Sequence, residues 1–398
     1  MQFPSVNEQM DLIRRNSVEI ISEDELVKKI ENAIISQKPL KIKLGADPSR
    51  PDLHLGHSVV LRKLRDFQDL GHHAILIIGD FTAMIGDPSG KNKTRPQLTS
   101  KETKENGKSY FDQASKILLE TKTEIRYNSE WLGAMSFEAV IRLASRYTVA
   151  RMLERDDFEK RYKSGEPISV HELLYPLAQA MDSVELKNDV ELGGTDQKFN
   201  LLVARDIQRE YGITSPQVCV TLPLLEGTDG VQKMSKTLDN YIGFHHTPNE
   251  MFQRLINIPD TLMMKYALLT GILTKDEITV LEQRINENPR EAKHFLAMRI
   301  TSFFHSEEDA GREKEIADGK TDSLTIFSLK DDIVVPLIDI LINYGKITSK
   351  TEARRLIIQG AVSIDGEKVL DVNMLVDLTK PRTFKVGKKI MFAIFRDI

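Results

Sequence analysis

The sequence of 398 residues contains one cysteine, Cys219, and no long hydrophobic run. A single cysteine excludes a disulfide framework and a cysteine-based zinc site, and it suits a reducing compartment. The first twenty residues lack the apolar core of a signal peptide, and no stretch approaches the roughly 18 consecutive apolar residues that a membrane span needs. These absences lead us to expect a cytoplasmic protein with no membrane partner.

An excess of basic charge is also missing. Lysine and arginine number 55 against 59 aspartate and glutamate residues, a net charge of -4. No chain-wide basic field therefore attracts nucleic acid, and any RNA contact must come from a local patch. Hydrophobic residues make up 40% of the chain and charged residues 29%, which is ordinary for a globular protein with two or three cores.

Apolar runs alternate with helical periodicity in the first part of the chain, after an amphipathic helix expected over residues 23–36. Runs at 40–46 and 74–78 flank a helical pattern over 58–70, which predicts a strand–helix–strand unit. Further strand-like runs, separated by long helical patterns, cover 123–127, 189–192 and 217–222. We expect an α/β fold with a parallel sheet covered on both faces, which binds ligands at the carboxyl ends of its strands.

The strand pattern fades beyond Thr247. Residues 248–318 predict helices with breaks at Pro259, Gly271 and Pro289, and the polar stretch 317–325 predicts a linker. We therefore expect three domains, which cover residues 1–246, 247–325 and 326–398.

The densest group of chemically useful residues runs from Gly45 to His57, where the first strand leads into its helix. His54 and His57 lie three apart at a helix start, where free backbone N–H groups attract phosphate, and Gly56 lets a nucleotide lie on the backbone. Capping or packing of the helix end is the alternative for such a short motif. A metal pair is less favoured, because the neighbouring ligands are only carboxylates.

The segment Gly86–Lys91 follows the second strand and superficially suggests a phosphate-binding P-loop. Ile85 stands where the first glycine of that motif belongs and Asn92 where a serine or threonine belongs, so a P-loop NTPase is rejected. Taken alone, the segment is better explained as a simple turn.

A third group, Tyr175, Gln179 and Asp182, lies at helical spacing, so a phenol, an amide and a carboxylate project within about 60° of one another. The stripe can recognise a small polar ligand. An exposed polar helix face would show the same pattern.

Two further motifs suit a nucleotide. Gly193–Gln197 places two glycines and Asp196 at a strand end, where a carboxylate can accept hydrogen bonds from ribose; a capped turn is the alternative. Lys233–Thr237 places two lysines in a glycine-flanked segment that can bring positive charge to a polyphosphate, although a solvated loop would look alike.

Together these motifs resemble the bacterial tyrosyl-tRNA synthetases, a family of class I aminoacyl-tRNA synthetases. His54–His57 is similar to the HIGH signature, and Lys233–Thr237 to KMSKS with threonine in place of the last serine. The resemblance extends through GDPSGK, YxxxQxxD and GGTDQ over essentially the whole chain, in the right order. It implies a Rossmann-like catalytic domain, an α-helical anticodon-region domain and a small S4-like RNA-binding domain.

The resemblance implies a tyrosine–tRNA ligase. Tyrosine would react with ATP to give tyrosyl-adenylate and pyrophosphate, and would then be transferred to the 3′-terminal adenosine of tRNA(Tyr). For tyrosine it implies that Asp182 accepts the phenol and that Asp87, Tyr175 and Gln179 hold the ammonium group, with Gly45 and Gln197 in the same pocket. An unpaired buried phenol is costly, so an acceptor is needed there.

The resemblance assigns ATP, as a substrate, to residues in the two signatures and the glycine-rich turn: Asp47, Ser49, His54, Gly56, His57, Gly194, Asp196, Lys233, Met234, Ser235 and Lys236. The expected catalytic residues are His54, His57, Lys91, Arg95, Lys233 and Lys236, which position reactants and neutralise charge without a protein nucleophile. Mg²⁺ would accompany ATP through phosphate oxygens and water, with no dedicated protein metal site. The family also implies a homodimer.

One departure marks a subtype. Lys43-Leu44-Gly45 stands where many of these enzymes have Tyr-Cys-Gly, so the role of Lys43 is open, and it could pair with Asp182. Lys198 stands where a tryptophan is common.

The chain from Ile333 onward resembles an S4-like RNA-binding domain. Residues 322–398 contain 12 basic and 10 acidic residues, so any RNA site there must be a one-sided patch. We expect that patch to include Lys350, Arg354, Arg355 and Lys368.

Two other classes compete with the ligase. Asp182 favours a phenol over the indole of a tryptophan-activating relative, because an indole N–H offers no second polar group of that kind. The intact histidines and lysines argue against a non-catalytic RNA-binding relative.

Overall fold

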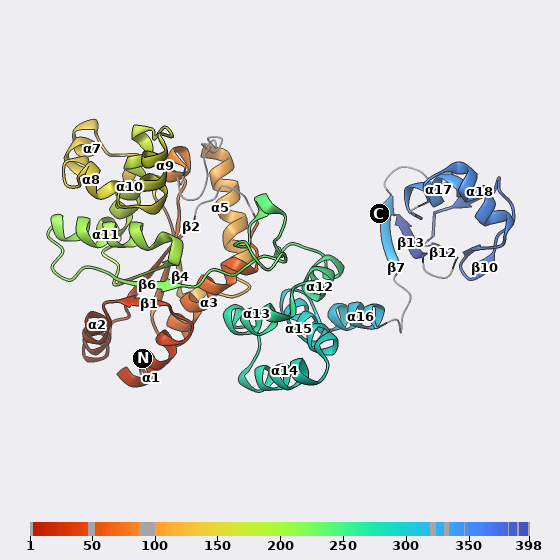
Figure 1. Cartoon of the computed structure of the whole chain (residues 1–398), viewed down its shortest axis with the longest axis horizontal. Coiled ribbons are helices and arrows are strands. Elements are labelled where there is room, and N and C mark those ends of the chain that lie inside the picture. The colour runs from red at the N-terminus through yellow and green to blue at the C-terminus, as the bar shows by residue number, and fades with distance from the viewer. Residues whose placement is uncertain are drawn as a thin grey trace. The chain divides into compact units, whose positions relative to one another are not determined.

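The computed structural model describes residues 3–46, 52–86, 100–318, 324–329, 334–345, 347–380, 382–387 and 390–396 (Figure 1). The chain forms two compact units, Met1–Ser306 and Glu307–Ile398, and each is described by itself.

A six-stranded sheet with the order β1-β6-β5-β2-β3-β4 forms the centre of the first unit. Its strands are β1 Glu19–Ile21, β2 Lys41–Ala46, β3 His73–Ile78, β4 Thr123–Tyr127, β5 Val190–Gly194 and β6 Val218–Leu222. Neighbouring strands are parallel except for β1, which pairs antiparallel with β6. The predicted parallel sheet is confirmed, and β1, with three residues, was too short to be recognised.

The strand order reverses between β2 and β5. From β2 the chain proceeds through α3 Leu55–Asp69 to β3, and from β5 it proceeds in the other direction through α11 Lys198–Glu210 to β6. Right-handed crossovers in opposite directions put the two helices on opposite faces of the sheet, and Figure 1 shows α3 and α11 on different sides. Such a reversal point is where open α/β sheets bind their ligands.

The remaining helices of the α/β part surround the sheet. They are α1 Val6–Arg14, α2 Glu23–Ser36, α4 Thr82–Ile85, α5 Ser100–Ala114, α6 Ser129–Leu132, α7 Phe137–Ala144, α8 Val149–Met152, α9 Asp156–Ser164 and α10 Val170–Leu186, with short 3₁₀ turns η1 Glu120–Lys122, η2 Thr195–Gln197 and η3 Lys236–Leu238. Helix α2 has the bounds predicted for it, because Ser22 caps its start by accepting from the Glu25 N–H and Gln37 ends it at a left-handed φ of 53°.

Helix α10 packs on α11 through an apolar cluster that includes Leu143, Met152, Leu177, Ala180, Val203, Ala204 and Ile207. This contact holds one side of α10, so its remaining side is directed to the end of the sheet. The fold thereby positions a helix over the strand ends of β2 and β5.

The predicted helical region is confirmed. It contains α12 Pro248–Ile256, η4 Asp260–Leu262, α13 Met263–Thr270, α14 Lys275–Glu287 and α15 Pro289–Phe304. The predicted breaks have local causes: Pro259 precedes η4, Gly271 ends α13 with a φ of 61°, and Pro289 opens α15. Helix α13 packs against α3, so this region belongs to the first unit.

The second unit is small and α+β, as predicted for residues 326–398, but it begins at Glu307 and so includes α16, which was expected in the helical region. It contains α16 Glu307–Ala317, β7 Leu324–Leu329, β8 Val334–Pro336, α17 Leu337–Asn343, α18 Lys350–Ile358, β9 Val362–Ile364, β10 Glu367–Lys368, β11 Leu375–Asp377, β12 Arg382–Val386 and β13 Ile390–Arg396. One sheet has the order β10-β9-β12-β13-β7, and β8 pairs with β11. Leu324 and Thr325, predicted as linker, belong to β7, because that strand pairs in parallel with β13 far along the chain.

The core of the second unit joins α17, α18 and the sheet. Leu341, Ile357 and Phe384 are fully buried there, and the rings of Phe384 and Phe392 stack with centroids 4.9 Å apart. A separate core supports a domain that folds around its own apolar residues.

Candidate active site

A pocket opens at the carboxyl ends of β2, β3 and β5, beneath α10. The space inside it, together with the open solvent at its mouth, measures about 410 Å³. The pocket is lined by Gly45, Ala46, Ile77, Gly79, Thr82, Asn128, Tyr175, Gln179, Asp182 and Gln197. Five of the residues that the sequence predicts for tyrosine therefore lie around one cavity: Gly45, Tyr175, Gln179, Asp182 and Gln197. Asp87, the sixth, lies outside the described residues.

Glycines keep the strand ends open. A Cβ atom on Gly45 would meet no protein atom within 4 Å, so it would enter free space at the pocket wall. A Cβ on Gly193 would come within 2.9 Å of Oε1 of Gln197, which would displace that side chain. Glycine at residue 193 thus leaves room for the Gln197 side chain.

The stripe of Tyr175, Gln179 and Asp182 lies on α10 with its side chains at the pocket. Tyr175 is 7% exposed and Asp182 is 3% exposed. The alternative of an exposed polar helix face is therefore wrong. A phenol and a carboxylate taken out of water in this way require polar partners, from the protein or from a ligand, and Gln179 between them is partly buried.

Asp182 is the buried acid of the pocket. Its Oδ1 accepts a hydrogen bond from Nε1 of Trp131 at 2.9 Å. Burial raises the pKa of Asp182 to about 7, against the opposing effects of the Lys43 charge and the Trp131 hydrogen bond. The carboxyl group therefore changes protonation near neutral pH, and its oxygens are suited to a hydroxyl group of a ligand.

Lys43 does not pair with Asp182. Its Nζ lies 3.0 Å from Oε1 of Glu191 and donates to Oγ of Ser183 at 2.6 Å. Lys43 and Glu191 stand opposite each other on β2 and β5, so both side chains point to the same face of the sheet. The pair supports the floor of the pocket.

His54 and His57 stand at the first turn of α3, as the sequence predicts. Nδ1 of His54 accepts from the Gly56 N–H at 3.2 Å, and Nδ1 of His57 accepts from the His54 N–H at 3.1 Å. Because each Nδ1 is an acceptor, the proton of each neutral ring is on Nε2, which can donate to a ligand oxygen.

Both rings are neutral at pH 7. Burial, together with the charges of His57 and Lys236, lowers the pKa of His54 well below its ordinary value. Burial and the Lys236 charge lower the pKa of His57 to about 4. Each ring can therefore act as a neutral hydrogen-bond donor at neutral pH.

The predicted lysine segment lies beside these histidines. Sδ of Met234, a buried residue, is 3.3 Å from the Gly56 N–H, and Nζ of Lys233 is 2.5 Å from Oδ2 of Asp196. Nζ of Lys236 is 3.6 Å from Oδ2 of Asp52. Residues far apart in the sequence are thus in contact here: Gly56 with Met234, Asp196 with Lys233, and Asp52 with Lys236.

The glycine-rich turn and the end of the lysine segment have local roles. A Cβ on Gly194 would collide with Oδ1 of Asp196, so the glycine leaves room for that carboxylate. Oγ of Ser235 accepts from the Thr237 N–H at 3.2 Å and caps η3.

Other predicted residues lie elsewhere. Asp47, Ser49, Lys91 and Arg95 fall outside the described residues. In the second unit, the side chains predicted for RNA are all exposed: Lys350, Arg354 and Arg355 on α18, and Lys368 on β10.

Sequence reasoning missed several pocket residues. Asn128 follows β4 and lines the pocket, and Trp131 on α6 bonds to Asp182. Glu191 could have been identified as unusual from the sequence, because it is a charged residue inside an apolar strand of a sheet expected to be buried on both faces. Its partner Lys43 could be assigned only after the strand order was known.

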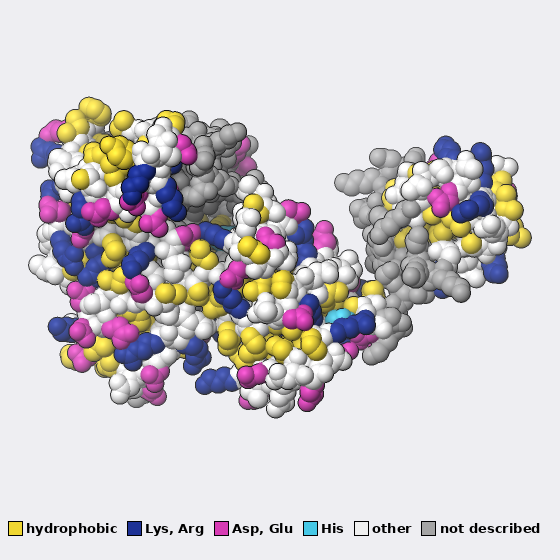
Figure 2. Space-filling model, viewed as in Figure 1, with side chains coloured by type: hydrophobic (Ala, Val, Ile, Leu, Met, Phe, Trp, Pro, Cys, Tyr) yellow, Lys and Arg dark blue, Asp and Glu magenta, His cyan; other side chains and the backbone are white. Residues whose placement is uncertain are grey.

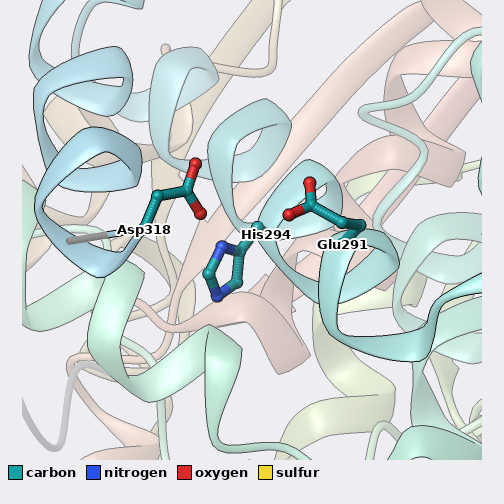
Figure 3. Close-up of side chains that lie close together, drawn as sticks. All are labelled: Glu291, His294 and Asp318. Atoms are coloured by element: carbon teal, nitrogen blue, oxygen red, sulfur yellow. The ribbon is translucent and has the colours of Figure 1, made fainter. Parts of the chain in front are cut away.

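Among the residues that the structure describes, one group of acidic and histidine side chains lies close together outside the pocket. Figure 3 shows Glu291 and His294 on α15 and Asp318 just beyond α16. Asp318 belongs to the second unit, so we assign no site to these residues. Across the described ranges, none of the helices has the length and apolar character needed to cross a membrane.

Comparisons with known proteins agree with this geometry. The family of class I tRNA synthetases (W and Y) matches residues 36–317, and the tyrosine–tRNA ligase SYY-like C-terminal domain matches residues 315–386. The tyrosine–tRNA ligase of Chlorobium luteolum is 59% identical over 99% of this chain and 98% of its own length. That of Thermotoga maritima is 51% identical over 97% of both chains.

Solved structures share the fold. The crystal structure of tyrosyl-tRNA synthetase complexed with L-tyrosine from Archaeoglobus fulgidus is 26% identical, with a TM-score of 0.62 over 78% of this chain and 100% of that chain. A C-terminally truncated mitochondrial tyrosyl-tRNA synthetase from Aspergillus nidulans, at 22% identity, has a TM-score of 0.64 over 80% of this chain and 94% of that chain. The chain belongs to the class I tRNA synthetases (W and Y) and, within them, to the tyrosine–tRNA ligases.

Proposed function

We propose that this chain activates tyrosine with ATP at the pocket beneath α10 and then transfers the tyrosyl group to tRNA(Tyr). In the first step a carboxylate oxygen of tyrosine attacks the α-phosphorus of ATP, the bond to the bridging oxygen breaks, and pyrophosphate leaves. In the second step a ribose hydroxyl of the terminal adenosine attacks the acyl carbon, and AMP leaves. Neither step needs a protein nucleophile.

The observation that carries the proposal is the convergence of Gly45, Tyr175, Gln179, Asp182 and Gln197 on one pocket at the reversal point of the sheet. These residues come from three separate segments. A buried carboxyl group at one position and an amide with a phenol at another suit an amino acid that carries a hydroxyl group at its far end.

Within the pocket, Asp182 accepts the substrate phenol. Tyr175 and Gln179, with Asp87, hold the ammonium group, and Gly45 and Gln197 contact the amino acid from the strand ends. Leaving Asp182 without a hydroxyl partner is costly in a buried site, so phenylalanine is disfavoured. Tyrosyl-tRNA synthetases are themselves the standard example of this rule, in which a site built for a hydroxyl group rejects the analogue that lacks it.

For ATP, we propose that Nε2–H groups of His54 and His57 donate to phosphate oxygens while Gly56 allows close approach of the nucleotide. Gly194 and Asp196 bind the ribose, and Lys233 and Lys236 neutralise the charge that develops on the triphosphate. Further contacts come from Asp47, Ser49, Lys91, Arg95, Met234 and Ser235. Mg²⁺ enters with ATP as part of the substrate.

The ion pair between Lys233 and Asp196 affects how ATP binds. Lys233 bonds to the carboxylate that we assign to ribose, Asp196. ATP must replace that ion pair with its own hydroxyl and phosphate contacts. Both side chains are partly exposed, at 56% and 32%, so solvent weakens the pair and the exchange costs little.

The partners extend beyond the pocket. We propose that the helical region over residues 247–325 contacts the anticodon region and that the S4-like domain over residues 326–398 binds tRNA through Lys350, Arg354, Arg355 and Lys368. Because tRNA charging supplies the ribosome, we place the protein in the cytoplasm.

A homodimer is supported by an apolar surface on the first unit. Phe137 is 80% exposed, Val149 60% and Val170 76%, on α7, α8 and α10. Figure 2 shows hydrophobic side chains gathered over this region. A second copy of this chain would cover side chains that are unfavourable in water.

The test is exchange of labelled pyrophosphate into ATP by the purified chain, run with each of the twenty amino acids and without tRNA. Exchange with tyrosine alone is expected. Exchange with tryptophan instead would overturn the role of Asp182, and exchange with none would leave only an RNA-binding function.

A further inference from the structure

A buried ion pair lies beneath the pocket. Lys43 and Glu191 have side-chain exposures of 0% and 1%, and they face each other across the central strands β2 and β5. A buried pair of charges is costly to desolvate and seldom adds stability over apolar residues of similar size. Its presence in the middle of an apolar sheet therefore points to a function beyond holding the fold.

Both carboxylate oxygens of Glu191 accept hydrogen bonds from neighbouring side chains. Its Oε1 receives Nζ of Lys43 at 3.0 Å and Nε2 of Gln179 at 3.2 Å. Its Oε2 accepts from Oγ of Ser183 at 3.2 Å and from Nε2 of Gln217. An ionised carboxylate has about four acceptor positions, so these contacts use its capacity. Glu191 thus presents only acceptors to its neighbours.

The amide oxygen of Gln179 accepts a hydrogen bond on the side opposite Glu191. Nδ2 of Asn200 donates to Oε1 of Gln179 at 2.9 Å, and a guanidinium N–H of Arg155 donates to Oδ1 of Asn200 at 3.3 Å. Arg155 is 5% exposed and Asn200 is 3% exposed. Because a guanidinium group can only donate, it fixes which end of the Asn200 amide faces it.

These contacts form a chain with one direction, here called the carboxamide relay: Arg155, Asn200, Gln179, Glu191 and Lys43. Arg155 donates to Asn200, Asn200 donates to Gln179, and Gln179 donates to Glu191. Glu191, at the end of this series, also accepts from Lys43. Turning the Gln179 amide over would place its oxygen against the Glu191 carboxylate and its N–H₂ group against that of Asn200. Both contacts would be repulsive, so the two amides have a single orientation.

We propose that Lys43, Glu191, Asn200 and Arg155 are positioning residues that fix the orientation of the Gln179 carboxamide and so set the affinity of the pocket for the amino group of its substrate. This inference rests on the proposed tyrosine site. Gln179 lines the pocket and keeps one oxygen lone pair and one N–H beyond the relay. The relay holds that acceptor ready before the substrate arrives, which lowers the cost of binding.

The sharpest test reverses the relay at Asn200. Asn200→Asp keeps the size of the side chain and gives Arg155 a carboxylate partner, so the fold should survive. Its carboxylate repels Oε1 of Gln179 and attracts Nε2, so it competes with Glu191 for the N–H₂ group of Gln179 and the amide loses its single orientation. We expect the KM for tyrosine in pyrophosphate exchange to rise about tenfold or more, while the KM for ATP stays within about twofold.

A second variant removes the charges without leaving one unpaired. Lys43→Met combined with Glu191→Gln conserves volume, and the new amide at residue 191 can donate or accept, so the direction of the relay is lost. A rise of about fivefold in the KM for tyrosine is expected. The matched control is Arg161→Met with Glu172→Gln, which neutralises a pair at 2.6 Å on α9 and α10 away from the pocket lining.

A substrate analogue separates positioning from general damage. 3-(4-Hydroxyphenyl)propionate keeps the phenol and the carboxylate but lacks the amino group, so its Ki against tyrosine should change less than about twofold in both relay variants. Unchanged KM for tyrosine in folded variants, an equal loss for the analogue, or the same loss in the control would each overturn the proposal. Absence of tyrosine-dependent exchange by the unmodified chain would instead overturn the proposed function.

Discussion

The two sides of the active site are built in different ways. On the side that we propose binds the amino acid, Asp182 and Lys43 are buried at 3% and 0% exposure, and each of the two has a protein partner. On the side that we propose binds ATP, the side chain of Lys233 is 56% exposed, and that of Lys236, at 11%, lies beside Asp52, which is 37% exposed. One side is fixed before any ligand binds, and the other carries charges that can change partners.

The difference follows from what each ligand demands. Discrimination among amino acids depends on a few polar contacts, and these discriminate strongly only where water is excluded and the groups are held in place. A triphosphate carries several charges and leaves as pyrophosphate after the reaction. Lys233, whose side chain is 56% exposed, can bind the triphosphate and then release it, because solvent weakens its ion pairs.

The largest effect is expected from Asp182→Asn. The amide oxygen can keep the Trp131 hydrogen bond, but a neutral amide accepts the phenol less strongly. The kcat/KM for tyrosine in pyrophosphate exchange should fall roughly 10²- to 10³-fold without loss of the fold. Asp66→Asn on α3 is the control, because burial also raises the pKa of Asp66. Exchange within about threefold of the unmodified chain would contradict the assignment.

On the nucleotide side, Lys236→Met should lower the kcat of exchange about 10²-fold, because it removes charge that stabilises the departing pyrophosphate. The KM for tyrosine should stay within about twofold, since the amino-acid side is formed independently. Lys293→Met, which breaks a pair with Asp260 at 2.7 Å, is the control. A parallel loss of tyrosine affinity would show that the two sides are not separate.

The pH dependence should also differ between the two sides. The pKa of Asp182 is about 7, so the carboxylate is mostly protonated at pH 6 and mostly ionised at pH 8. Because the ionised form accepts the phenol, the KM for tyrosine should fall about tenfold as the pH rises from 6 to 8. The KM for ATP should not follow this titration, because burial and Lys236 hold the pKa of His57 at about 4. A tyrosine KM that is flat over this interval would remove Asp182 as the titrating group.

The same shift predicts a change in stability. The folded pKa of Asp182 lies above the value of an unfolded aspartate near 3.9, so the folded chain binds more protons between these values. The stability that this group contributes is present below about pH 4 and is lost as pH rises through about 7. The variant Asp182→Asn does not titrate at this position. Without ligand, the Tm of the unmodified chain should therefore fall relative to that of the variant as the pH rises from 5 to 8.

Gly45→Ala should give a smaller effect on the amino-acid side. Its Cβ would meet no protein atom within 4 Å and would enter the pocket. The KM for tyrosine should rise about fivefold with little change in Tm. Gly311→Ala is the control, because its Cβ also meets nothing within 4 Å and α16 is far along the chain from the pocket lining.

The smallest effect is expected in the second unit, because the described residues that line the pocket all belong to the first unit. Arg354→Ala should leave pyrophosphate exchange unchanged and reduce tRNA charging about threefold, with a weaker dependence on salt. If exchange falls as well, Arg354 acts through the fold rather than through tRNA.

Local patterns predicted much of the fold and part of the site. The bounds of α2, the helical spacing of Tyr175 and Asp182 on α10, and the histidines at the start of α3 all follow from caps, periodicity and helix-end chemistry. These are short-range properties, because a residue three or four positions away decides them.

Contacts between residues far apart in the sequence could not be predicted from the sequence. Lys43 and Glu191 are separated by much of the α/β part of the chain, and either could have had another partner until the neighbouring strands were known. The strand β1 and the residues Asn128 and Trp131 were missed for the same reason, since their roles depend on what packs against them.

By itself the sequence determined the chemical groups, the order of the main helical and strand regions, and the family. Only the tertiary structure decided that Lys43 pairs with Glu191 rather than with Asp182, that a chain of hydrogen bonds sets the direction of the Gln179 amide, and that Lys233 rests on Asp196. The physical reason is that hydrogen bonds and ion pairs depend on distance and direction in space, which spacing along the chain does not define.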